Sequence, residues 1–186
     1  RLLRNPRGAK WQKPRFPGDP GVGYVYFGAV IDVSTTVTAF ESRVGRTLGS
    51  RGDFHQADSP RSLIPRARED VQSRRFSVLS IKPPGSWREV AEGVHNGWLD
   101  EILEGLGALD APMAFTIHHE PEDDADAADN APQWHKAMTE FVHARADRLA
   151  PKVNVIQILM QYTFRPGNGR NPRDWLAPSV RLFGLD

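Results

Sequence analysis

The sequence contains no cysteine among its 186 residues. This absence excludes a thiol nucleophile, a cysteine-ligated zinc site and any disulfide bond. It does not identify the cellular compartment, because a secreted domain of this size can rely on its hydrophobic core alone. Catalytic or binding chemistry must therefore come from carboxylates, histidines, other polar side chains and aromatic rings.

The sequence also lacks a strong net charge and a long apolar run. Its formal net charge of +1 gives no electrostatic basis for binding a nucleic acid or a membrane surface. No apolar stretch approaches the roughly 20 residues that a membrane-spanning helix needs. We therefore expect neither partner, and we expect a monomer.

The remaining composition is that of a globular domain, with 39% hydrophobic and 25% charged residues. Residues 1–22 are basic and rich in Pro and Gly, which is typical of a linker or of an irregular cover over a first strand. Residues 23–186 are expected to form one domain. The first residue is Arg, and no signal-peptide pattern follows. We expect both ends to be cut from a longer, secreted protein of bacterial origin.

Short strand-like segments alternate with amphipathic helical segments along this domain. The strands are expected at 23–30, 52–58, 74–82, 111–120, 152–162 and 180–186. The helices are expected at 34–45, 59–73, 86–109 and 131–150, with a short helical start at 171–176.

Strands separated by helices predict a parallel sheet, either doubly wound or closed into a (β/α)₈ TIM barrel. No G-x-G-x-x-G or Walker pattern follows the first strand, which disfavours a nucleotide-binding sheet. Polar residues instead follow the strands, where a barrel builds its active site: Asp32, His55, Lys82, Glu120 and Tyr162. A complete barrel has about 250 residues, so we expect an α/β chain with only about five and a half of the eight β/α units.

The fourth strand carries the most suggestive residues. Strict alternation would place Met113, Phe115 and Ile117 on the helix-facing side. It would place Ala114, Thr116, His118 and Glu120 on the side of the barrel lumen. Pro121 ends the strand, which leaves Glu120 as a carboxyl group at its carboxyl end.

Metal binding is the second interpretation of this segment. Alternation would send His118 and His119 to opposite faces, and no H-E-x-x-H helix or H-x-H strand is present. The acidic run from Glu122 to Asp129 lacks the glycine and spacing of an EF-hand, so we expect a solvated loop. We expect no metal ion or other cofactor.

The segments "AFTIHHEPEDD" (114–124), "QWHKAMTEFVHARADRLAPKVNVIQILMQYTF" (133–164) and "LFGLD" (182–186) resemble glycoside hydrolase family 26, a family of bacterial (β/α)₈ glycanases. The resemblance covers residues 25–186 and is most specific at "HHEP". It implies a retaining β-glycanase in which a Glu ending the fourth strand is the general acid/base. In this chain that residue is Glu120, preceded by His119. The nucleophilic Glu ends the seventh strand of the family's barrel and would lie beyond residue 186, so the fragment alone is expected to be inactive.

On this interpretation the substrate is a β-linked polysaccharide, mannan- or glucan-like, cleaved between two carboxyl groups. Side chains expected to contact it are His118, His119, His55, Lys82 and Tyr162. Gln157 and Gln161 would add hydrogen bonds in the lumen, whereas the tryptophans at 87, 98 and 134 are expected in the core. The alternatives that remain open are a metal-dependent barrel hydrolase and a non-catalytic carbohydrate-binding domain.

Overall fold

The computed structural model describes residues 2–4, 15–21, 23–31, 34–58 and 60–186. Its centre is a five-stranded parallel sheet in sequential order, formed by β3 (Gly28–Val30), β4 (Ser50–His55), β5 (Phe76–Ile81), β6 (Met113–Ile117) and β7 (Val153–Val155). A second parallel pair, β8 (Gln157–Leu159) and β9 (Phe183–Leu185), continues from it after Ile156. The parallel α/β organisation predicted from the sequence is confirmed.

Two of the predicted strands are each divided into two short pieces. The first consists of β2 (Tyr24–Tyr26) and β3, separated by Phe27. The fifth consists of β7 and β8, separated by Ile156. Leu2–Arg4, expected to be irregular, forms β1 and pairs antiparallel with β2.

Helices connect the successive parallel strands of the sheet. They are α1 (Val37–Val44), α2 (Pro60–Gln72), α3 (Trp87–Ala91), α4 (Asn96–Gly107) and α5 (Pro132–Leu149), with 3₁₀ turns η1 (Pro121–Asp123), η2 (Gln161–Phe164) and η3 (Pro172–Asp174). The helix expected at 86–109 is in fact two helices, because Gly93 adopts a left-handed φ of 82°. None of the described helices is both long and apolar enough to cross a membrane.

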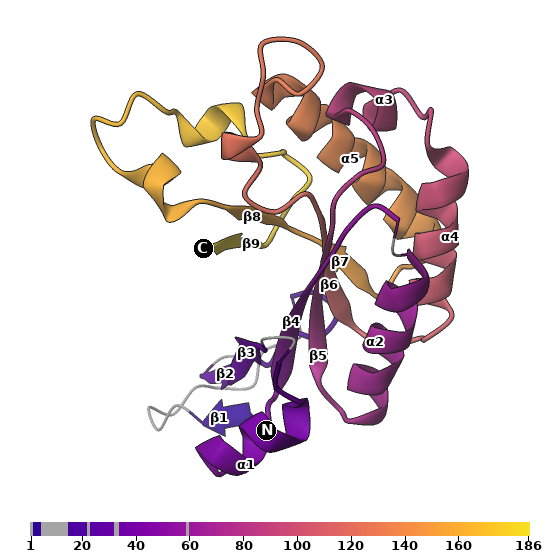
Figure 1. Cartoon of the computed structure of the whole chain (residues 1–186), viewed down its shortest axis with the longest axis vertical. Helices are drawn as coiled ribbons and strands as arrows, with labels where there is room; N and C mark the ends of the chain where they lie inside the picture. Colours follow the sequence, from indigo (N-terminus) through magenta and orange to yellow (C-terminus); the bar gives the residue numbers. More distant parts are fainter. Residues whose placement is uncertain (1, 5–14, 22, 32–33, 59) are drawn as a thin grey trace.

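The helices α2, α4 and α5 cover one face of the sheet (Figure 1). The helix-facing side chains of the central strands, including Leu79, Phe115 and Ile117, are almost fully buried there. Trp87 is also buried in this core, as expected, and Trp98 and Trp134 pack against its edge.

The opposite face of the sheet lines a hollow of about 430 Å³. Its lining is mostly apolar, and Phe54 of β4, Val78 of β5, Ala114 of β6 and Ile158 of β8 contribute to it. This face corresponds to the inside of a TIM barrel. The described strands form a partial barrel that does not close.

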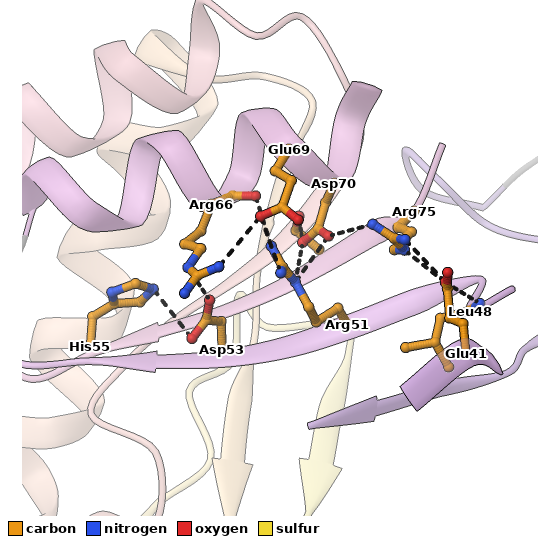
Figure 2. A network of polar contacts seen from close by, with 10 residues as sticks. Glu41, Leu48, Arg51, Asp53, His55, Arg66, Glu69, Asp70 and Arg75 are labelled. Atoms are coloured by element: carbon orange, nitrogen blue, oxygen red, sulfur yellow. Dashed lines mark hydrogen bonds and ion pairs between the residues drawn. The ribbon is translucent and has the colours of Figure 1, made fainter. Parts of the chain in front are cut away.

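A buried network of charged residues joins β4 to α2 and α1 (Figure 2). The guanidinium of Arg51 pairs with Asp70 at 3.0 Å, and Arg75 lies between Asp70 and Glu41. The carboxylate of Glu41 also accepts the backbone N–H of Leu48. These contacts hold the helix-facing side of β4 against α2.

Candidate functional site

The carboxyl ends of the parallel strands gather several titratable side chains at one edge of the sheet. The loop after β6 and the loop after β8 project from this same edge (Figure 1). Arg170 in the second loop pairs with Asp123 in the first at 3.0 Å. The buried carboxylate of Glu122 accepts hydrogen bonds from Thr163 Oγ1 and from the backbone N–H of Met160. The two loops therefore form one connected rim.

The backbone turns sharply where β6 ends. His118 and Glu120 have φ values of 59° and 48°, in the left-handed region that residues other than glycine rarely adopt. Neighbouring strands still hold this turn, because the N–H of His118 donates to Ile81 O and that of Glu120 donates to Ile158 O. Alternation of side chains therefore stops at Ile117.

This turn reverses the predicted orientation of the two histidines. His118 was expected in the lumen, but its ring lies on the helix side and contacts Trp87. His119 was expected on the opposite face to Glu120, but it lies on the lumen side beside Phe54. The prediction was wrong because it assumed an extended strand through Glu120, and the left-handed residue at 118 shifts the alternation by one position.

His118 is held between an indole and a carboxylate. Trp87 Nε1–H donates to His118 Nδ1 at 2.8 Å, so His118 carries its proton on Nε2 and donates it to Asp124 Oδ2 at 2.7 Å. The same carboxylate oxygen accepts from Lys82 Nζ at 2.9 Å. Burial lowers the pKa of His118, and an Nδ1 that accepts the indole N–H belongs to a neutral ring. The role of this histidine in the structure is to order the loop after β6.

His119 lies beside Phe54, one of the residues that line the hollow. Its Nδ1 lies 2.9 Å from Ser80 Oγ, and its ring stacks on Phe54 with the centroids 4.2 Å apart. Burial lowers the pKa of His119 as well. Phe54 is 40% exposed and therefore presents an aromatic surface at the carboxyl end of β4. Sequence reasoning missed Phe54, although its alternation with Asp53 and His55 could have indicated it.

Glu120 is the central carboxyl group of the site. Partial burial raises its pKa first, and the negative charges of Asp186, Glu122 and Asp123 raise it further. Asp186 follows β9, and its N–H donates to Leu159 O. The backbone N–H of Glu120 donates to the carbonyl oxygen of Ile158, the residue before Leu159 on β8. Glu120 and Asp186 thus flank the end of β8, a proximity that the sequence did not reveal.

The other residues expected to bind substrate have different surroundings. The ring of His55 lies on the helix side, 3.1 Å from Ser62 Oγ, and not beside Glu120, since Phe54 occupies the lumen-facing position of β4. Lys82 is at the rim, where its ammonium group pairs with Asp124. Tyr162 is 45% exposed and lies near the guanidinium groups of Arg165 and Arg170. Asp32 lies outside the described residues.

Two further expectations about polar residues need correction. Gln157 was expected in the lumen, but it is buried on the helix side, where it contacts His135 and the segment at 175–177. Ile156 and Ile158 line the hollow in its place. Glu122 was expected in a solvated loop, but it is only 5% exposed because it accepts the hydrogen bonds that join the two loops.

No family model and no curated protein matches this chain. Similar solved structures include the YdhT protein of Bacillus subtilis (TM-score 0.55, 12% identity) and the B. subtilis mannanases man26 (0.54, 12%) and BCman (0.51, 11%). Each comparison covers 86% of this chain and 61% of the other chain. At this low identity the likeness is one of fold, and the chain spans about 61% of the length of each of these structures.

Proposed function

We propose that this chain is part of a retaining glycoside hydrolase of family 26 that cleaves a β-linked, mannan- or glucan-like polysaccharide. Glu120 is its general acid/base. The observation that carries the proposal is the position of Glu120: it follows the fourth barrel strand, faces neighbouring carboxylates and has a raised pKa. A raised pKa favours the protonated carboxyl group that a general acid requires.

The surroundings of Glu120 support a sugar-binding role. His119 and Phe54 present stacked rings beside the hollow, and aromatic faces are suited to the apolar faces of sugar rings. Lys82 and Tyr162 at the rim remain proposed contacts for more distant sugar units. His118 and His55 face the helices, so any role of theirs in binding would be indirect.

Asp186 supplies a negative charge close to Glu120, which favours the protonated acid. In family 26 the nucleophile is a Glu that ends a seventh strand, whereas β9 is the sixth strand of the barrel order here. We therefore assign Asp186 to the electrostatic environment of Glu120 and propose that the nucleophile comes from outside residues 1–186. The complete enzyme is proposed to be a secreted monomer.

The alternative of a metal-dependent barrel hydrolase gains no support from the site. In the described ranges, no three His, Asp or Glu side chains gather closely enough to hold a metal ion. The acidic side chains that this alternative would use already have hydrogen-bond partners. Asp124 accepts from Lys82 and His118, and Glu122 accepts from Thr163.

The test is Glu120→Gln in the full-length protein, with hydrolysis of mannan and β-glucan as the measurement. Loss of proton transfer should lower kcat by about 10²- to 10⁴-fold. The matched control is Glu101→Gln, which removes an exposed carboxylate on α4, behind the sheet, and should leave hydrolysis nearly unchanged. Wild-type hydrolysis by the Glu120 variant would refute the assignment. Glycan binding by the unmodified protein without any turnover would instead favour a non-catalytic carbohydrate-binding domain.

A further inference from the structure

The turn that presents Glu120 is energetically unfavourable by itself. Two of its three residues, His118 and Glu120, occupy the left-handed region, and neither is a glycine. Such a conformation persists only where surrounding contacts hold it. The side chain of His118 is held by Trp87 and Asp124, and its backbone carbonyl has a separate partner in the core.

That partner is His135 on α5. Its Nε2 lies 3.3 Å from the carbonyl oxygen of His118, and its Nδ1 lies 3.3 Å from Nε2 of Gln157 on β8. His135 and Gln157 are each only 1% exposed. Neither residue contacts the hollow, and no step of the proposed reaction uses either of them.

The protons in this chain of contacts can have only one arrangement. Gln157 Oε1 accepts the backbone N–H of Ala177, and Gln157 Nε2 donates to the carbonyl of Trp175. These two backbone groups fix the orientation of the amide, because an N–H can only donate and a carbonyl can only accept. Gln157 Nε2 must then donate to His135 Nδ1, which leaves the imidazole proton on Nε2 and directs it at His118 O.

We propose that His135 and Gln157 are positioning residues that hold the backbone turn at His118 and thereby direct His119 and Glu120 to the lumen side of the sheet. The chain of contacts runs from the segment after η3 through β8 and α5 to the end of β6. It therefore couples the loop after β8 to the geometry of the acid. The catalytic purpose of this arrangement rests on the proposed function, whereas the arrangement itself does not.

The test compares His135→Gln with His135→Met in the full chain. The two replacements have similar volume, but only glutamine can donate to His118 O and accept from Gln157. The first measurement is the pKa of the Glu120 carboxyl group, followed by ¹³C NMR. We expect a downward shift toward its ordinary value of 4.5 in the methionine variant, because a released turn exposes Glu120 to water. The glutamine variant should restore the wild-type pKa.

The second measurement is the tautomer of His135, read from its ¹⁵N chemical shifts. The wild type should show the Nε2–H form, and Gln157→Glu should abolish it, because a carboxylate cannot donate to Nδ1. A wild-type Glu120 pKa in His135→Met, or an Nδ1–H tautomer in the wild type, would overturn the proposal. If His135→Met fails to fold, Gln157→Leu replaces it with the same expected shift. Both measurements are independent of glycan turnover, so failure of the proposed function is detected separately.

Discussion

Asp70 of α2 lies 3.0 Å from the guanidinium of Arg51 on β4, and neither side chain is more than 4% exposed. Ser77 of β5 donates to the same carboxylate at 2.8 Å, and Arg75 approaches it at 3.7 Å. One carboxylate thus joins two neighbouring strands to the helix that covers them (Figure 2).

Replacing Asp70 with asparagine should destabilise the fold strongly. The change removes the buried carboxylate partner of Arg51 and leaves only the half-exposed Glu69 at 3.4 Å. Removing one member of a buried pair costs about 3–5 kcal/mol. Urea denaturation followed by circular dichroism measures the loss. The control is Glu92→Gln, whose pair with Arg88 is about half-exposed, because surface pairs of this kind contribute little to stability. Equal losses in the two variants would show that burial of the Arg51–Asp70 pair has no special energetic weight.

Replacing Asp186 with asparagine should lower the pKa of Glu120. Among the nearby negative charges, Asp186 makes the largest contribution to the raised pKa of Glu120. Its removal makes ionisation of Glu120 easier. The pKa is measured by ¹³C NMR titration of the Glu120 carboxyl group. Asp123→Asn removes a weaker contribution and should give a smaller shift. An unchanged Glu120 pKa in the Asp186 variant would mean that the two carboxyl groups do not interact.

His135 should make stability depend on pH. Burial lowers its pKa from 6.5 to about 3 in the folded chain, so between these values the unfolded chain binds a proton that the folded chain does not. The free energy of unfolding is therefore unaffected by the protonation of His135 above pH 6.5. Between pH 6.5 and about 3 it falls with decreasing pH, by about 1.4 kcal/mol per pH unit. His135→Gln should reduce the slope of unfolding free energy between pH 6 and 5 by nearly that amount. A slope identical to that of the wild type would contradict the burial of a neutral His135.

Thr163→Val should loosen the loop after β8. The hydroxyl of Thr163 donates to the buried carboxylate of Glu122 at 2.7 Å, and losing a hydrogen bond to a charged group costs about 1.5–3 kcal/mol. We expect faster limited proteolysis between 160 and 175 and a lower midpoint in urea. Thr163→Ser keeps the donor and should behave like the wild type. If the valine and serine variants resist the protease equally, the Glu122 contact does not hold the loop.

Much of the fold was predictable because it depends on local patterns. The apolar stripe and Pro60 correctly predicted the helix α2. The alternation of Met113, Phe115 and Ile117 correctly predicted which side of β6 faces the helices. The break between α3 and α4 at Gly93 was not predicted, because the apolar stripe of 86–109 continues through a residue whose left-handed conformation is set by its surroundings. For Gln157, alternation correctly placed its side chain on the same face as Val155 and Leu159. The prediction failed because it assigned that face to the lumen, whereas it packs against the helices.

By itself, the sequence determined a parallel α/β chain with a carboxyl group, Glu120, just after the fourth strand of its barrel order, since hydrophobic periodicity and the proline at 121 act over a few residues. Only the tertiary structure decided which histidine lies beside Glu120 and which carboxylate raises its pKa. Those two facts depend on the left-handed turn at His118, held by His135 from α5, and on the end of β9 lying next to β8. Contacts between segments so far apart in the chain leave no periodic signal in the sequence.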